Sequence, residues 1–332
     1  MSLTSTTMTR PVADRRVPAD KSARTSAKKR SGSAKPVRAG EAVLGYVDAQ
    51  LAQLRRLEPA VRGAEPDAVH QMRVAARRTR AVLQEFRPLF GGAAALEPVL
   101  TELRWLGQEL AAARDVEVLR DLLIAELDEV PVESVLGPVR ARVIGHYAPR
   151  LAQAESQVRE ILDSARYRRL LAELAALVAS PPSAAEAGLA AREVLPGMVA
   201  HSQRRVRRRM RAARQASGLG GERDRALHEA RKAAKRARYA AEAVAPVIGR
   251  RSNKSAKALK KLQSTLGEHH DSVIAADELR LLAIRVHAEG ENAYTYGLLN
   301  ARQAERAERL ADRARREWRR ADRHKRIAWM AA

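Results

Sequence analysis

The fold is indicated most clearly by two matching stretches, HQMRVAARRTRA at residues 70–81 and HEARKAAKRARY at residues 228–239. They align without a gap, histidine with histidine, and four basic positions of the first match four basic positions of the second. Around both stretches apolar residues recur three and four positions apart, which is the period of an amphipathic α-helix. A repeated helical unit predicts two similar helical bundles in tandem.

A second set of matches follows each stretch. Its residues pair at an offset of 156, against 158 for the two stretches, and a loop of different length explains the two-residue difference. The paired positions are Leu103 with Leu259, Arg104 with Lys260, Leu106 with Leu262, Leu110 with Leu266 and Asp115 with Asp271. The repeat therefore extends beyond a single helix.

From residue 41 onward the chain is rich in Ala, Leu, Arg and Glu and lacks alternating β-branched or aromatic runs, so we expect an all-α fold. Glycine and proline predict breaks at residues 63–66, 91–92, 131, 137–138, 180–182, 218–221, 249–252 and 290, which leave about ten helices. The spacing of Ser183 and Glu186 is that of a capping box and predicts a helix start directly after the double proline. We predict one folded domain at residues 41–328, with repeats at about 41–180 and 184–328.

The charge of the chain points to an anionic partner. The 332 residues include 62 Lys and Arg against 39 Asp and Glu, a formal net charge of +23. Ten of the basic and two of the acidic residues lie within residues 1–40, among Ser, Thr, Ala and Pro, so we predict a disordered basic arm there. The other 292 residues still carry +15, so the folded part is basic as well.

The composition also excludes several classes of protein. Because the chain has no cysteine, it has no disulfide, thiolate metal site or cysteine nucleophile. Neither an apolar leader nor a membrane-spanning stretch is found, so we expect a cytoplasmic protein without a membrane partner. Phe, Trp and Tyr make up only 3% of the chain, so a platform that stacks nucleic-acid bases is not expected.

Basic residues form stripes along three predicted helices. In each stripe the residues follow the spacing 0, 3, 7 and 10, which places them on one face of a helix, with apolar residues on the other side. The first stripe is His70, Arg73, Arg77 and Arg80; the second is His228, Arg231, Lys235 and Arg238; the third is Arg204, Arg207, Arg211 and Arg214, with Arg208 beside it.

These stripes differ from an ordinary exposed helix. Residues 301–325 mix acidic residues with their arginines, whereas the three stripes contain no acidic residue. Because like charges one turn apart on a helix are unfavourable, we expect an anion to bind along the stripes. A stripe of ten residues spans about 15 Å, which suits a chain of phosphates better than a single phosphate. The predicted ligand is therefore a linear polyanion.

Several motifs together are similar to those of a known family. They are the two His-x-x-Arg-x-x-x-(Arg/Lys)-Arg-x-Arg stretches, RDV at residues 114–116, HDS at residues 270–272 and SARYRRLL at residues 164–171. With these motifs the chain resembles, over about residues 41–320, the CHAD family, the conserved histidine α-helical domain. The resemblance implies two helical bundles related by a pseudo-two-fold axis. It further implies that basic helices face a central groove that binds inorganic polyphosphate, often at polyphosphate granules.

The resemblance also implies which residues bind the ligand. Carried over by position, the first motif matches His70, Arg73, Arg77 and Arg80, and the second matches His228, Arg231, Lys232, Lys235, Arg236 and Arg238. We add Arg78, Arg104, Arg204, Arg207, Arg208, Arg211 and Lys260 as predicted polyphosphate-binding residues. The two motif histidines either contact the ligand or hold the helices in place.

We expect no enzymatic activity, and we predict no catalytic residue, metal or cofactor. The triphosphate tunnel metalloenzymes often encoded beside the family carry a Glu-x-Glu-x-Lys motif that is absent here, and no phosphate-binding glycine loop occurs. The run EHHD at residues 268–271 resembles a metal site, but adjacent helical residues point about 100° apart and cannot close around one ion. We expect Asp271, like Asp115, to pair with or orient a basic residue of the groove.

An alternative function is non-specific binding or compaction of DNA through the basic arm and the basic helix faces. Such binding needs only phosphates and would weaken steeply with salt. However, the sequence shows no helix-turn-helix or zinc-finger pattern that would read bases. The sequence does not identify a protein partner.

Overall fold

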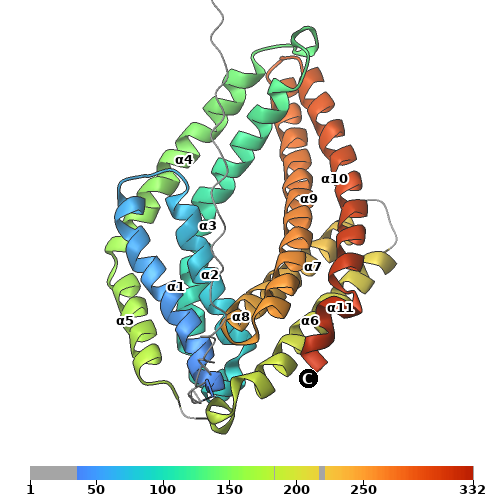
Figure 1. Ribbon diagram of the computed structural model, residues 1–332. Helices are drawn as coiled ribbons and strands as arrows, with labels where there is room; N and C mark the ends of the chain where they lie inside the picture. Colours follow the sequence, from blue (N-terminus) through green and yellow to red (C-terminus); the bar gives the residue numbers. More distant parts are fainter. Residues whose placement is uncertain (1–35, 183, 217–220, 332) are drawn as a thin grey trace, which may run out of the picture. The chain divides into compact units, whose positions relative to one another are not determined.

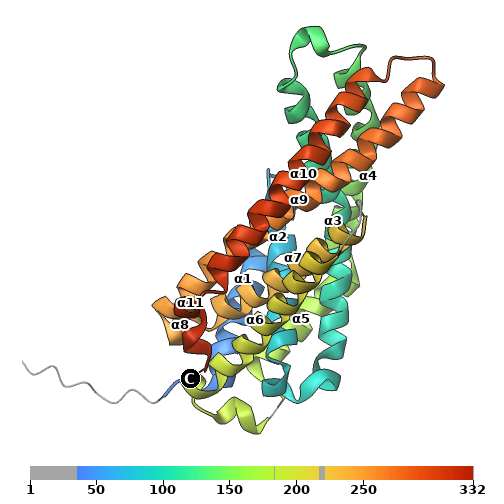
Figure 2. The same cartoon turned by 90° about the vertical axis from the view of Figure 1, so that its right-hand side faces the viewer.

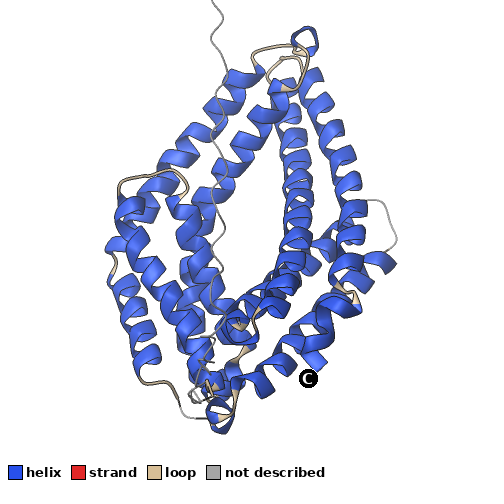
Figure 3. Ribbon diagram, viewed as in Figure 1, coloured by secondary structure: helices blue, strands red, loops and turns tan. Residues whose placement is uncertain are grey.

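A computed structural model describes residues 36–182, 184–216 and 221–331, apart from the side chains of residues 112 and 113. Within these residues the chain forms eleven α-helices and four short 3₁₀ helices without a strand (Figure 3). The predicted all-α class is confirmed. Among the described residues, every helix is too short or too polar to cross a lipid bilayer.

The helices fall into two runs along the chain (Figure 1). The first run is α1 (Ala39–Arg62), α2 (Ala68–Glu85), α3 (Gly92–Asp128), α4 (Val139–Asp163) and α5 (Ala165–Ala179). The second is α6 (Ala191–Gln215), α7 (Gly221–Ala243), α8 (Ala245–Ile248), α9 (Arg250–Ala288), α10 (Tyr294–Ala321) and α11 (His324–Ile327). The 3₁₀ helices are Arg87–Phe90, Val132–Ser134, Ala185–Gly188 and Ala328–Ala331.

The two aligned stretches lie in α2 and α7, and a long helix follows each of them. These long helices, α3 and α9, have 37 and 39 residues. Helix α2 packs on α1 and α3, α7 packs on α6 and α9, and α2 and α7 also contact each other. The helices that carry the repeat therefore also join the two runs. A rotation axis between the runs stays a prediction, as do the repeat boundaries.

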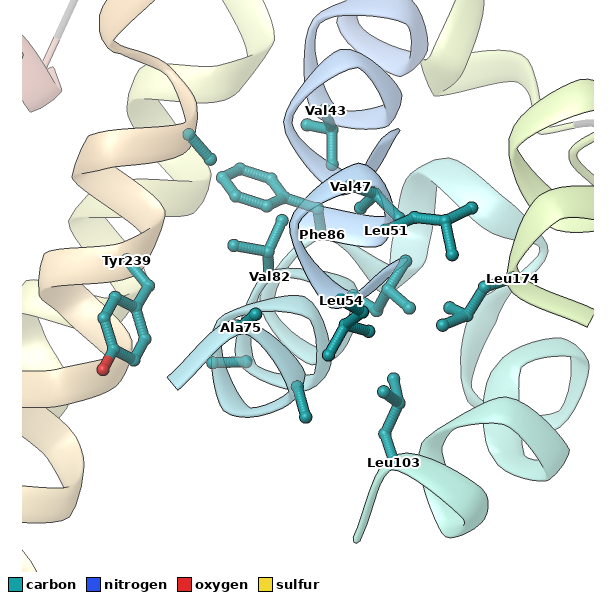
Figure 4. Close-up of a cluster of buried hydrophobic side chains, with 14 of the residues drawn as sticks. Val43, Val47, Leu51, Leu54, Ala75, Val82, Phe86, Leu103, Leu174 and Tyr239 are labelled. Carbon is teal, nitrogen blue, oxygen red and sulfur yellow. The ribbon is translucent and has the colours of Figure 1, made fainter. Parts of the chain in front are cut away.

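Apolar side chains bury the helix faces opposite the basic stripes. Val82 of α2 and Phe86, the residue directly after α2, pack against Val43 and Val47 of α1, in a cluster that also includes Tyr239 of α7 (Figure 4). A second buried cluster joins α6, α7, α9 and α10. A third joins the far ends of α3 and α4 to α9 and α10, where these helices converge in Figure 1. Apolar packing within both runs of helices thus fixes the α2–α7 junction. The basic faces of α2 and α7 lie outside these apolar clusters.

Two helix starts differ from the sequence prediction. Helix α1 begins at Ala39, and the segment before it pairs with the backbone ahead of α6: the Ala191 N–H donates to the Val37 carbonyl at 2.9 Å. The folded part therefore begins before residue 41, because residues 37–39 form backbone hydrogen bonds with the segment at the start of α6. The rest of the predicted arm, residues 1–35, lies outside the described residues. After the double proline the chain forms the 3₁₀ helix Ala185–Gly188, and α6 begins only at Ala191. Ser183, the predicted cap, lies outside the described residues.

Breaks that were not predicted lie at residue 244 between α7 and α8, at residues 322–323 between α10 and α11, and at Ser164 between α4 and α5. The Ser164 hydroxyl accepts a hydrogen bond from the Tyr167 backbone N–H at 3.1 Å, which caps α5. No glycine or proline marks this position, so only the cap itself could have signalled it. The other predicted breaks coincide with helix ends among the described residues, because glycine and proline act locally.

Candidate anion-binding site

Four partly buried cations gather where α2 and α7 meet, two from each helix: Arg73 and Arg77 from α2, Arg231 and Lys235 from α7. We call them the central cations. Burial lowers the pKa of Arg231, and the positive charges of Arg77 and Arg73 lower it further. The first and second stripes therefore face each other closely enough for their charges to interact.

Lys235 shows the strongest effect of this crowding. Burial lowers the pKa of its ammonium group to about 6, with further lowering by Arg77, Arg231 and Arg73. A lysine with such a pKa is mostly neutral at pH 7. Burial and the three neighbouring cations therefore disfavour a fourth positive charge at this site, and a bound anion would favour it.

Two aspartates at matching positions of the repeat partly offset the central cations. Arg73 donates to Asp115 of α3, with Nη1 and Oδ1 2.9 Å apart. Burial raises the pKa of Asp271 in α9, and the charges of Arg231 and Lys235 oppose that rise. Each aspartate accompanies basic residues of its own repeat, as expected from the sequence. Two carboxylates face four cationic groups, so the site keeps an excess of positive charge.

The motif histidines flank the central cations. The rings of His228 and His270 lie 4.1 Å apart between centroids. Burial lowers the pKa of His70, with further lowering by Arg114, and it lowers the pKa of His270 to about 4. Among the described residues, the Nδ1 atoms of His70 and His228 are buried without a hydrogen-bond partner.

The basic surface continues from the central cations to a second group. Burial lowers the pKa of Arg80, and the charges of Arg236 and Arg104 lower it further. Burial also lowers the pKa of Arg236, with further lowering by Arg205 and Arg209 of α6. The structure thus brings together predicted residues from α2, α3 and α7, and it adds Arg205 and Arg209, which the sequence analysis missed. The sequence could have indicated these two residues, because on a helical wheel they lie on the side of α6 opposite the third stripe. The structure turns that side toward α7.

Arg78 and Arg238 are engaged elsewhere in the α2–α7 junction. Arg238 donates through Nε to Glu242 at 2.6 Å, and the Arg78 Nη2 lies 3.7 Å from the same carboxylate. Both guanidinium groups lie over the Tyr239 ring, 5.6 Å from its centroid for Arg78 and 5.3 Å for Arg238. Because Arg238 is only 9% exposed and shares a carboxylate with Arg78, these two predicted residues form a structural cluster within the junction.

The third stripe does not join the central cations. Arg207 donates to Asp322 through Nε at 2.9 Å and through Nη2 at 2.8 Å. With Arg211 and Arg214 it lines a cavity between α6 and α10. Of the remaining predicted residues, Arg204, Arg208 and Lys260 face solvent, and the exposed Lys232 forms an ion pair with Glu229. Arg104, which belongs to the second basic group, also lies 3.6 Å from Glu97.

The EHHD run disperses, as its spacing on a helix requires. His269 faces Asp224 of α7, with Nε2 and Oδ1 3.3 Å apart, whereas His270 faces His228. Within residues 36–182, 184–216 and 221–331, no three His, Asp or Glu side chains converge in a way that could hold a metal ion.

Comparisons with known proteins agree with this architecture. The sequence model of the family described as CHAD domain matches residues 45–280. An uncharacterized protein of Mycobacterium tuberculosis, Rv2226, is 39% identical over 268 residues, which cover 80% of this chain and 50% of that protein. The chain therefore spans about half the length of this relative.

Two solved structures are similar to the described fold. One is the CHAD domain from the plant Ricinus communis, with 28% identity, a TM-score of 0.64 and coverage of 86% of this chain and 92% of that one. The other is PptA from Streptomyces chartreusis, with 22% identity, a TM-score of 0.64 and coverage of 86% and 99%. The second likeness concerns the fold alone.

Proposed function

This chain belongs to the CHAD domain family, and from that premise we propose that it binds inorganic polyphosphate at the α2–α7 junction without catalysing a reaction. The observation that carries the proposal is the group of central cations, which two repeats bring together although their charges repel. A protein maintains such an arrangement at a cost in stability, and an anion that bridges both helices relieves the cost.

A linear anion fits the extent of the basic surface. From Arg73 to Arg80 the first stripe covers about 10 Å along α2, and Arg104, Arg236, Arg205 and Arg209 extend the surface beyond it. Arginine donates two parallel hydrogen bonds to phosphate oxygens, and the lysine adds a point charge. Successive phosphates can therefore be bound by successive groups.

Binding of this kind follows two physical rules. Each neutralised phosphate releases counterions, so affinity decreases steeply with salt. Each additional phosphate meets additional cations until the basic surface is filled, so affinity increases with chain length up to that limit. The proposal includes a location at polyphosphate granules, because the domain would gather where its ligand is dense.

The test is a calorimetric titration of the full chain with long-chain polyphosphate and with duplex DNA, at equal phosphate concentration and near physiological salt. A variant with Arg73→Ala, Arg77→Ala, Arg231→Ala and Lys235→Ala removes the central cations. A matched variant with Arg55→Ala, Arg56→Ala, Arg250→Ala and Arg251→Ala removes four exposed basic residues elsewhere.

We expect tight polyphosphate binding and weak DNA binding by the unmodified chain. Polyphosphate binding should be lost in the first variant and retained in the matched variant, with helix content unchanged in both. Equal binding to both polymers, or an equal loss in the two variants, would contradict the proposal. In that case general surface charge and nucleic acid become the better explanation.

A further inference from the structure

A basic cavity of about 560 Å³ lies between α6 and α10. It is formed by the third stripe on one side and by the last turns of α10 on the other. Its lining residues are Arg207, Met210, Arg211, Arg214, Asp312, Arg315, Arg316, Trp318, Arg319 and Asp322. Arg205 and Arg209, which lie near Arg236 of α7, are not among them. The cavity therefore differs from the surface at the α2–α7 junction.

The cavity has more positive charge than its carboxylates balance. It has six arginines and two aspartates. Asp322 accepts both hydrogen bonds of Arg207, and Asp312 accepts one from Arg315 at 2.8 Å. In the part of the chain that the structure describes, the other four arginines form no ion pair: Arg211, Arg214, Arg316 and Arg319. Their donors remain available to an anion.

The apolar part of the cavity is equally informative. Met210 is buried and Trp318 is partly buried, and both belong to the packing of the second core cluster while lining the cavity. An indole ring beside several guanidinium groups suits a ligand with a flat ring and negative charge, because the ring can stack while the arginines bind the charge. A bare phosphate chain would gain nothing from the indole.

We propose that this cavity binds a nucleoside triphosphate, with the base against Trp318 and the phosphates bound by Arg211, Arg214 and Arg319. The volume lies within the range of about 300–1,000 Å³ that small-molecule sites occupy. Binding of this ligand depends neither on the central cations nor on polyphosphate. Either proposal can therefore fail while the other holds.

The test is calorimetric titration of the full chain with ATP and, separately, with inorganic tripolyphosphate. The variant Arg211→Ala, Arg319→Ala removes two lining charges, and the variant Arg225→Ala, Arg320→Ala removes two exposed charges outside the cavity. Trp318→Leu removes the aromatic ring and Trp318→Phe retains one. Near-ultraviolet circular dichroism checks that each variant keeps its packing.

We expect ATP to bind about tenfold more tightly than tripolyphosphate, and Trp318→Leu to lose about that factor, while Trp318→Phe stays close to the unmodified chain. The double variant in the cavity should lose at least tenfold in ATP affinity, whereas its matched control should not change. Removing the four central cations should leave ATP binding intact.

Three results would overturn the inference. They are equal affinity for ATP and tripolyphosphate, an equal loss in the cavity variant and its control, and loss of ATP binding on removal of the central cations. The last result would place ATP at the α2–α7 junction and would leave polyphosphate binding there untouched. If Trp318→Leu loses its packing, Trp318→Phe and the charge variants still decide the question.

Discussion

The two copies of the aligned stretch have the same basic pattern, but their surroundings make their charges behave differently. In the first repeat the central cations are two arginines, and Arg73 pairs with an Asp115 side chain that is 69% exposed. In the second repeat Arg231 lies deeper, and burial lowers the pKa of Lys235 to about 6. Because arginine keeps its proton in proteins, the first repeat supplies two permanent charges, whereas the second supplies one permanent charge at Arg231 and one at Lys235 that depends on pH and ligand.

The residues beside the basic stripes also differ between the two repeats. Among its charged neighbours, His70 has Arg114; the residue that matches Arg114 in the second repeat is His270, whose ring lies against that of His228. In α7, Glu242 neutralises Arg238 and Arg78, whereas the matching position of α2 is Gln84. The two similar stretches thus lie in different surroundings, and burial, together with the central cations of α2, lowers the pKa of both central cations of α7.

The largest expected effect comes from removing the central cations one repeat at a time. At pH 8, Arg73→Ala with Arg77→Ala should weaken polyphosphate binding by about 100-fold, because two charge-assisted hydrogen bonds are lost. Arg231→Ala with Lys235→Ala should cost about tenfold, because Lys235 is largely neutral there. Titration calorimetry measures both affinities, and equal losses at pH 8 would remove the distinction between the repeats.

The next effect concerns stability rather than binding. Glu242→Gln makes α7 resemble α2 at this position and leaves Arg238, which is 9% exposed, and Arg78 without a carboxylate. We expect a loss of about 2 kcal/mol in the free energy of unfolding, because a partly buried charge pair is broken. Urea denaturation followed by circular dichroism measures the change. Gln84→Ala is the matched control and should lower the free energy of unfolding by less. An equal loss in the two variants would show that the ion pairs of Glu242 add no stability.

A smaller effect is expected in the pH dependence of binding. Polyphosphate favours protonated Lys235, so affinity should increase as pH decreases from 8 to about 6 and should level off below that. The groups facing Lys235 are Arg73, Arg77, Arg231, Asp271 and His270. Lys235→Arg should bind about fivefold more tightly at pH 8 and lose this slope, since its charge is permanent.

The slope is checked by titrations between pH 5.5 and 8.5 in two buffers with different ionisation enthalpies. Proton uptake on binding at pH 7 by the unmodified chain, and its absence in Lys235→Arg, is the expected pair of results. If both chains take up the same number of protons, the titrating group is another one, and the contrast between the repeats does not lie at Lys235.

The smallest effect tests why Arg231 lies deep. A Cβ placed on Gly267 of α9 would lie 3.5 Å from the Arg231 Nε, an ordinary contact distance. Ala111 holds the matching position of α3. Gly267→Ala should therefore be tolerated and should stabilise the helix by up to about 1 kcal/mol, which thermal denaturation measures. A lower melting temperature would show that Arg231 needs the space that glycine leaves.

Much of the fold could be predicted from local sequence. The spacing of apolar residues predicted helices, glycine and proline predicted most of their ends, and the two aligned stretches lie in α2 and α7. The break at Ser164 and the start of α1 at Ala39 could not be predicted in the same way. The first depends on a single side-chain cap, and the second depends on backbone pairing with a segment about 150 residues away.

The candidate site, like the fold, could be predicted from the sequence only in part. By itself the sequence determined which residues share a helix face, because 3.6 residues per turn fix that relation within each helix. Only the tertiary structure decided that Arg73 and Arg77 face Arg231 and Lys235, that Arg78 and Arg238 share Glu242, and that the third stripe turns toward α10. Which face meets which neighbour follows from the burial of apolar surface summed over distant contacts, and no local pattern contains that sum.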